Sequence, residues 1–224
     1  MKKYSIIVAG GMGSRMESSI PKQFLMLMDK PVLYYTLDTF LKSYNDMHII
    51  LVLPEEFMGT GQEIIDAYFD YSRIKITAGG RTRFHSVQNG LKLIEEESIV
   101  LVHDAVRCLL DVSLIHQCYE AAFEYGAVVP AIACKDSVRI ILEDGSNEGV
   151  ERRNVRLIQT PQAFLSTILK PAYAIDYKDK FTDEATVVEA FGMKVKLIEG
   201  DEHNIKITRP QDLVLAQMYL QKKT

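Results

Sequence analysis

The sequence predicts an α/β protein built on a single doubly wound, mostly parallel sheet. Three observations support this prediction: short apolar runs alternate with segments of helical periodicity, the runs are continuous stretches of valine, isoleucine and leucine, and the connections are short. Continuous apolar strands are typical of parallel sheets buried on both faces, and strand–helix alternation gives right-handed crossovers. With 224 residues, 47% of them hydrophobic, the chain can bury one full core, so we expect one domain over 1–224.

The elements expected in the first 131 residues alternate strictly. Helix candidates show apolar residues at helical spacing, as Phe84, Val87 and Leu91 do. We expect strands over 4–8, 48–53, 74–78, 99–103 and 127–131, and helices near 31–42, 61–71, 81–94 and 113–125.

From Ser137 the alternation stops, and residues 137–158 are predicted to form a long-looped β-hairpin that projects from the sheet. We call this segment the arm. A two-stranded ribbon alone is only marginally stable in water, and apolar residues such as Ile140 and Ile141 need cover. A second subunit is the simplest cover, so we expect a homodimer formed through the arm. An arm folded back on its own domain is the alternative.

Beyond the arm, the strand–helix pattern returns. We expect a helix starting near 182–184, a strand over 194–198 and a short strand over 204–207. A last helix follows, and Thr208 and Gln211 have the spacing of a capping box at its start.

The first strand ends in a glycine-rich turn over 10–13, with Arg15 and Lys22 just beyond it. Glycines bring main-chain N–H groups close to an anion, and the two cations add full charges, an arrangement typical of polyphosphate binding. The turn is not a P-loop, because no Gly-Lys-Ser/Thr closes it. It is not a dinucleotide fingerprint either, because Met16 stands where the third glycine is needed. An oxidoreductase and a turn without a ligand are therefore the weaker alternatives.

A second glycine turn, over 79–83, puts two arginines in the first turn of a helix, where the helix dipole disfavours positive charge. We therefore expect an anion or a carboxylate nearby, with a local ion pair of Arg83 as the alternative. Gly80 and Ser86 could line a nucleobase pocket.

Asp104 ends the most hydrophobic strand, where an unpaired carboxylate is costly. It would suit Mg²⁺ or a substrate hydroxyl, with Arg107 beside it for a phosphate; a structural Asp104–Arg107 pair is the alternative. Ligands of such sheets bind at the carboxyl ends of the strands, so we expect the turns over 10–15, 79–83 and 104–107 to line one mouth. From the residues alone, Arg152 and Lys206 are typical of solvated surface charges, and Thr182 of a helix N-cap.

Composition narrows the possible partners and the compartment. A net charge of −4 with mixed signs gives no basic field for nucleic acid or a membrane surface. Three cysteines without C-x-x-C spacing do not form a disulfide framework. The apolar start is too short for a signal peptide, and no segment approaches the length of a membrane span. We therefore expect a cytoplasmic protein without nucleic-acid or membrane partners.

Six motifs follow one another along almost the whole chain: Ala9–Met16 with Pro21–Phe24, Gly79–Val87, His103–Arg107, Gln159–Gln162, Thr182–Ala185 and Asn204–Thr208. Taken in this order, they resemble the 2-C-methyl-D-erythritol 4-phosphate cytidylyltransferase family. Ribitol-5-phosphate cytidylyltransferase shares the first, third and fourth and is the enzyme alternative; a CTP-sensing module is the alternative from another class. Gly10 stands where many relatives have Ala, Cys108 where Pro is usual, and Arg81 at a variable position.

The resemblance implies a Rossmann-like nucleotide-diphospho-sugar transferase fold, cytidylyl transfer from CTP to a sugar-alcohol phosphate, and Mg²⁺ as cofactor, with Asp104 as a possible ligand. Catalytic roles fall to Arg15, Lys22, Arg152 and Lys206. The residues implied around CTP are Ala9, Gly10, Gly11, Gly13, Gly80, Ser86, Asp104 and Ala105. Those implied at the sugar phosphate are Arg107, Thr182 and Lys206, with Ser137 and Arg152 reaching it from the partner's arm.

Overall fold

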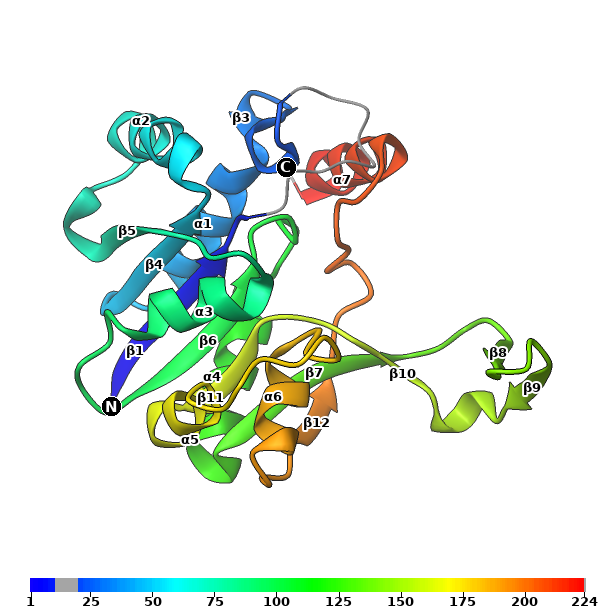
Figure 1. Ribbon diagram of the computed structural model, residues 1–224. Helices are drawn as coiled ribbons and strands as arrows, with labels where there is room; N and C mark the ends of the chain where they lie inside the picture. The colour runs from blue at the N-terminus through cyan, green and yellow to red at the C-terminus, as the bar shows by residue number, and fades with distance from the viewer. Residues whose placement is uncertain (11–19, 224) are drawn as a thin grey trace.

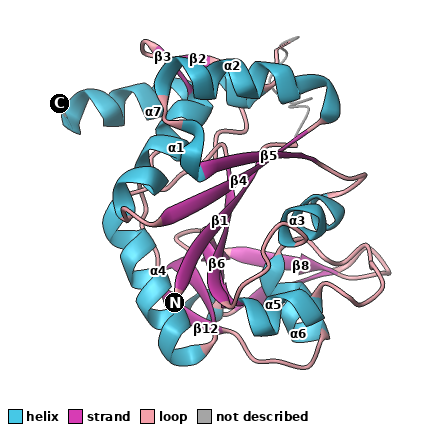
Figure 2. Ribbon diagram, turned by 90° about the vertical axis from the view of Figure 1, so that its left-hand side faces the viewer, coloured by secondary structure: helices cyan, strands magenta, loops and turns pink. Residues whose placement is uncertain are grey.

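A mixed, largely parallel sheet lies between two layers of helices (Figures 1 and 2). The computed structural model describes residues 1–10 and 20–223. The sheet has eight strands; the order along it is β10-β7-β11-β6-β1-β4-β5, and β12 pairs with β7. These strands are β1 (Lys2–Val8), β4 (Met47–Leu53), β5 (Ile74–Ala78), β6 (Ser98–Asp104), β7 (Ala127–Ala133), β10 (Arg156–Ile158), β11 (Gln162–Leu165) and β12 (Lys196–Glu199).

Helices cover both faces of the sheet, which confirms the doubly wound arrangement. Figure 2 shows α1 and α4 on one side and α3, α5 and α6 on the other. Phe40 and Ile115 pack in the core cluster of the first side, and Phe84 and Leu169 in that of the second. Within the described part of the chain, no helix has the length and apolar content needed to cross a membrane. The helices are α1 (Val32–Ser43), α2 (Met58–Tyr68), α3 (Arg83–Leu91), α4 (Val112–Tyr125), α5 (Ser166–Ala172), α6 (Glu184–Ala190) and α7 (Pro210–Lys223).

The strands that end at the predicted mouth are parallel, as expected. β1 pairs in parallel with β4 and β6, and β4 pairs in parallel with β5. The five predicted strands all exist, but the sheet contains one that the sequence did not indicate: β11 lies antiparallel between β6 and β7. Its four residues are too few to show a periodic pattern.

Local chemistry explains where the elements begin and end. β6 is buried over its whole length, as a continuous apolar run predicts. The side chain of Asp111 accepts a hydrogen bond of 3.0 Å from the Ser113 N–H and so caps the start of α4. The helix ends at Gly126, whose φ of 82° is readily adopted by glycine.

Three predictions for the last quarter of the chain are wrong. Residues 204–207 form no strand. The main-chain hydrogen bond that joins them to the loop after β6 runs from the Ile207 N–H to the Val106 carbonyl oxygen, and one such bond does not make the repeated pairing of a β-sheet. The group that caps the start of α7 is the Asp212 carboxylate, which accepts from the Thr208 N–H and O–H at 2.8 Å, and not Gln211. The N-cap of α6 is Asp183 rather than Thr182, since the Asp183 side chain accepts from the Thr186 N–H.

The arm leaves the body as a two-stranded ribbon of β8 (Val138–Ile141) and β9 (Asn147–Val150), which pair antiparallel. Figure 1 shows it projecting beyond the sheet and its helices. The expected return strand ends early, however: residues 156–158 form β10, which pairs with β7 in the main sheet. Ile140 is 48% and Ile141 70% exposed, so within one chain the apolar side chains of the ribbon are not covered.

Candidate functional site

A pocket of about 310 Å³ opens at the carboxyl ends of β1, β5 and β6. Residues that follow these three strands form most of its wall, so the predicted convergence of the three turns is confirmed for the described residues. The residues singled out in the sequence that line it are Ala9, Gly10, Lys22, Gly80, Arg81, Arg83, Ser86, Asp104 and Lys206.

One end of the pocket is a tight turn closed by Ser86. The Ser86 hydroxyl accepts a hydrogen bond from the Gly80 N–H at 3.1 Å and donates to the Thr82 carbonyl oxygen at 3.0 Å. A Cβ on Gly80 would lie 2.4 Å from the Cβ of His85, so no other side chain fits there without a backbone shift. A Cβ on Gly10 would lie 3.8 Å from the Ser86 hydroxyl, which is an ordinary contact and the nearest one that the described residues offer. The turn brings main-chain groups within reach of a planar ligand.

Asp104 also lines the pocket, with its side chain only 12% exposed. One carboxylate oxygen lies 2.7 Å from the Lys206 ammonium and the other 3.2 Å from Nε of Arg83. Burial raises the pKa of Asp104, but the charges of Arg83 and Lys206 outweigh it and hold the pKa well below the usual range. Asp104 is therefore an ionised carboxylate at the pocket wall.

Two alternatives that the sequence left open, an Asp104–Arg107 ion pair and a solvated Lys206, are wrong. Arg107 does not pair with Asp104; its Nη1 donates to the Asn204 carbonyl oxygen at 2.8 Å instead. Lys206 is not a free surface charge, because it forms the ion pair with Asp104. The Lys22 ammonium donates to the Ile207 carbonyl oxygen at 3.1 Å. Because Ile207 directly follows Lys206 in the chain, the two lysines lie at one edge of the pocket.

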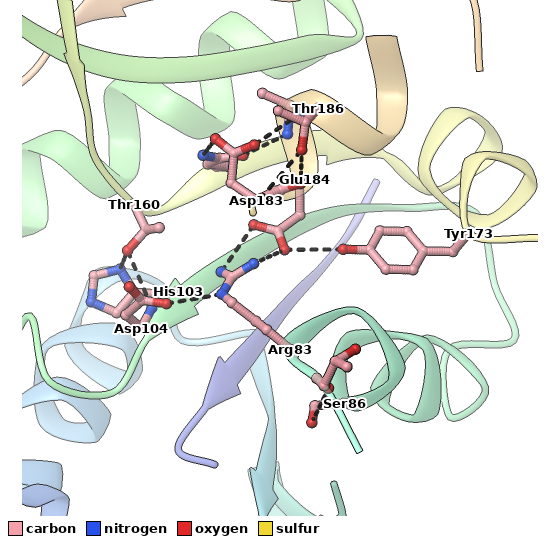
Figure 3. A network of polar contacts seen from close by, with 12 residues as sticks. Arg83, Ser86, His103, Asp104, Thr160, Tyr173, Asp183, Glu184 and Thr186 are labelled. Atoms are coloured by element: carbon pink, nitrogen blue, oxygen red, sulfur yellow. Dashed lines mark hydrogen bonds and ion pairs between the residues drawn. The ribbon is translucent and has the colours of Figure 1, made fainter. Parts of the chain in front are cut away.

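α3 begins at Arg83 after its N-cap Thr82, so the prediction of two arginines in its first turn is wrong for Arg81, which precedes the helix. Arg83 has the carboxylate partners that its position at a helix start predicts. It reaches Asp104 through Nε and Glu184 through Nη1 and Nη2, the latter at 3.1 Å (Figure 3). Glu184 is completely buried and also accepts a hydrogen bond of 3.1 Å from the Tyr173 hydroxyl. Burial opposes the charge of Arg83, but Glu184 and Asp104 raise its pKa above the ordinary value. Glu184 and Tyr173 are the site residues that sequence reasoning missed.

Several predicted residues lie outside the pocket wall. Ala105 is fully buried behind it, and its carbonyl oxygen accepts a hydrogen bond of 2.7 Å from Thr36. Thr182 is exposed just before α6. Ser137 and Arg152 are exposed on the arm, and Arg152 donates to the Lys135 carbonyl oxygen at 2.9 Å. Within a single chain none of these residues lines the pocket, and neither does Arg107.

The remaining predicted residues cannot be placed. Gly11, Gly13 and Arg15 lie within 11–19, outside the residues that the structure describes. Their roles stay predictions. What the described residues supply is a cavity with a glycine turn and a serine at one end, an ionised aspartate on one wall and two lysines along its edge. Such a set can hold a nucleoside against the turn and neutralise its phosphates at the lysines.

Comparison with known proteins gives consistent matches over the full chain. A sequence model of the family described as 2-C-methyl-D-erythritol 4-phosphate cytidylyltransferase matches residues 4–222. Proteins of that description from Phocaeicola vulgatus and Bacteroides thetaiotaomicron are 46% and 44% identical to the chain over 220 residues, which is 98% of this chain and 100% of each relative.

Solved structures agree with these relatives. The crystal structure of 4-diphosphocytidyl-2C-methyl-D-erythritol synthase from Anaerococcus prevotii superposes with a TM-score of 0.83 at 33% identity, covering 98% of this chain and 99% of that one. The 2-C-methyl-D-erythritol 4-phosphate cytidylyltransferase of Francisella tularensis gives a TM-score of 0.81 at 30% identity, with 97% and 99% covered.

Proposed function

Because the chain belongs to the 2-C-methyl-D-erythritol 4-phosphate cytidylyltransferase family, we propose that the pocket at the ends of β1, β5 and β6 is its active site. The reaction is transfer of a cytidylyl group from CTP to 2-C-methyl-D-erythritol 4-phosphate, EC 2.7.7.60, in the non-mevalonate route to isoprenoids. One observation supports the proposal above all. The glycine turn, the ionised Asp104 and the lysine pair Lys22 and Lys206 surround one cavity at the strand ends, where ligands of such sheets bind.

The nucleoside is assigned to the end of the pocket formed by Ala9, Gly10, Gly80 and Ser86. The close approach of main chain at Gly80 supports this assignment, because it offers N–H and carbonyl groups to the edge of a base. Ala105 supports this wall from behind. Gly11 and Gly13 are assigned to the triphosphate from the resemblance.

The acceptor is assigned to the edge of the pocket nearest Lys206. Arg107 and Thr182 are proposed to hold its phosphate together with Lys206. Ser137 and Arg152 are proposed to reach the same phosphate from the partner's arm, in a homodimer. The exposure of Ile140 and Ile141 on the arm supports a second subunit as their cover.

Catalysis then needs positioning and charge neutralisation rather than a covalent protein intermediate. An oxygen of the acceptor phosphate forms a bond to the α-phosphorus of CTP, and the bond from that phosphorus to the bridging oxygen of the β-phosphate breaks, releasing pyrophosphate. Two anions must approach each other for this step. Lys22, Lys206 and Arg15 are proposed to lower that repulsion, and a water-poor pocket strengthens their effect.

The chemistry of Asp104 fits Mg²⁺. Mg²⁺ takes oxygen ligands and is commonly held by one or two carboxylates together with substrate phosphates. Asp104 offers an ionised carboxylate at the pocket wall, whereas no cluster of three or more His, Cys, Asp or Glu side chains occurs among the described residues. When bound, Mg²⁺ neutralises charge on the phosphates and polarises the reacting one.

Pyrophosphate release from CTP across a panel of sugar-alcohol phosphates tests the proposal. We expect turnover with 2-C-methyl-D-erythritol 4-phosphate and Mg²⁺, and little or none with ribitol 5-phosphate. Turnover that is retained when Lys22 and Lys206 are both replaced by alanine would contradict the placement of the active site in this pocket.

A further inference from the structure

We propose that Glu184 is a positioning residue for the reaction: it holds Arg83 so that the carboxylate of Asp104 stays available to a cation bound with the nucleotide. The inference rests on the proposed function of the pocket. It concerns a residue that lies away from the cavity and reaches it only through Arg83.

The geometry divides the guanidinium of Arg83 between two carboxylates. Both terminal nitrogens face Glu184, with Nη2 at 3.1 Å, and only Nε faces Asp104, at 3.2 Å. Figure 3 shows Arg83 lying between the two acids, with Tyr173 on the far side of Glu184. Asp104 therefore receives a single N–H from Arg83 rather than the fork of two.

The charges of this network balance while Glu184 is present. Arg83 and Lys206 are the cations, and Asp104 and Glu184 the anions. The side chain of Lys206 is 40% exposed and can turn toward a bound phosphate, whereas that of Arg83 is 25% exposed and held by Glu184. Once Lys206 turns away, Arg83 is the remaining ion-pair partner of Asp104. The Asp104 oxygens are then free for a bound cation only as long as the terminal nitrogens of Arg83 stay bonded to Glu184.

Without the charge of Glu184, the two terminal nitrogens of Arg83 would turn to its other carboxylate partner, Asp104. A bidentate pair would occupy both oxygens of Asp104 and neutralise it, and a cation would then have to compete with a fixed guanidinium. The role of Glu184 is thus to keep Arg83 from capturing Asp104.

The position of Glu184 is itself fixed by neighbours that do not touch the pocket. It opens α6, and Gln162 of β11 ties down the residues on either side of it. The Gln162 side chain accepts from the Ala185 N–H at 2.9 Å and donates to the Asp183 carboxylate at 3.0 Å. The start of α6 is thereby anchored to the strand next to β6, which ends at Asp104.

The test is the variant Glu184→Gln, which keeps the shape of the side chain and removes its charge. Calorimetric titration of CTP at a series of Mg²⁺ concentrations measures binding apart from turnover. We expect the affinity for CTP in saturating Mg²⁺ to fall roughly 10- to 100-fold, the size typical of losing a charged hydrogen bond, with metal-free CTP changed less than about twofold. The Mg²⁺ concentration for half-maximal activity should rise in parallel.

Tyr173→Phe is the matched control, because it also removes a hydrogen bond from the buried Glu184 but leaves every charge in place. Its Mg²⁺ dependence should match the wild type. Should Glu184→Gln fail to fold, Glu184→Asp takes its place; it keeps the charge but is one methylene too short to engage both terminal nitrogens, and a smaller shift in the same direction is expected.

An equal loss of CTP affinity with and without Mg²⁺ would overturn the inference, and so would the same shift in Tyr173→Phe as in Glu184→Gln. An unchanged Mg²⁺ dependence in the folded Glu184 variant would do so as well. Failure of the wild-type chain to bind CTP or to release pyrophosphate is a different outcome, because it removes the proposed function itself.

Discussion

At the scale of single residues, Lys22 and Lys206 line the pocket together with Arg81 and Arg83, and they concentrate positive charge there in a chain that is negative overall. Lys22→Ala removes a cation placed where phosphate charge builds up, and we expect kcat to fall by about 10²–10³, as for other preorganised donors. Steady-state rates of pyrophosphate release at saturating substrates measure this loss. Lys30→Ala is a matched control, because Lys30 lies over the rings of Tyr34 and Tyr68 and does not line the pocket. Near-normal turnover of Lys22→Ala would remove its catalytic assignment.

His103 gives the fold a pH dependence of known sign. It is fully buried between the Thr160 hydroxyl and the Arg107 carbonyl oxygen, and burial lowers its pKa to about 3. The unfolded chain takes up a proton on this histidine near pH 6.5 while the folded chain does not. Its contribution to stability is therefore complete above that pH and is lost as the pH falls toward 3.

We expect this one group to lower the free energy of unfolding by about 2 kcal/mol between pH 7 and pH 5. Urea unfolding of the wild type at the two pH values measures this loss. In His103→Asn the loss between pH 7 and pH 5 should be smaller by about 2 kcal/mol, because the titrating group is gone. His203→Asn, at an exposed position, is the control. An equal pH dependence in wild type and His103→Asn would contradict the prediction.

The residues predicted from the sequence are those with a strong local signal. Glycine turns directly after strands located Gly10 and Gly80, and the cost of a carboxylate at an apolar strand end located Asp104. Glu184 could not be found in this way, because its partner Arg83 is 101 positions away in the sequence. The arginines at the helix start predicted that an acid exists nearby but not which one.

At the scale of elements, prediction succeeded where length and periodicity were both available. The long apolar runs became β1, β4 and β6, and their parallel pairing follows from the helices between them. β11 was missed because its four residues show no period, and its place between β6 and β7 depends on the chain returning after the arm. Residues 204–207 look like a strand but run past the sheet as a loop fixed by single hydrogen bonds.

The arm is the element whose packing the single chain leaves incomplete. Ile141→Asp puts a charge on its most exposed apolar residue. If a second subunit covers this ribbon, burying that charge should raise the dissociation constant of the dimer at least about tenfold. Analytical ultracentrifugation over a range of concentrations measures it. Phe123→Asp, which charges an exposed apolar residue on α4, should leave the dimer intact. A wild-type chain that is monomeric at micromolar concentration would end the proposal of an arm-mediated dimer.

At the scale of the whole molecule, the residues proposed for the active site lie in two separate parts of the chain, at the strand ends of the sheet and on the arm. Five of the residues assigned to CTP line one cavity at the strand ends within one chain: Ala9, Gly10, Gly80, Ser86 and Asp104. Ser137 directly precedes β8, Arg152 follows β9, and neither lines that pocket. The ribbon between them stands off the body (Figure 1). We propose that a partner's arm completes the acceptor site, so that each active site would draw on both subunits.

Mixed dimers test this division directly. A dimer that pairs an Arg152→Ala chain with a Lys22→Ala chain has one pocket with intact Lys22 facing an intact arm, and one pocket in which both are changed. Such a heterodimer, purified through two different tags and assayed at subsaturating acceptor, should recover about half of the wild-type activity per dimer, because one of two symmetric sites is whole. Each variant alone should be strongly impaired under these conditions. If the arm instead served its own chain, every pocket in the heterodimer would carry one defect, and mixing would restore nothing.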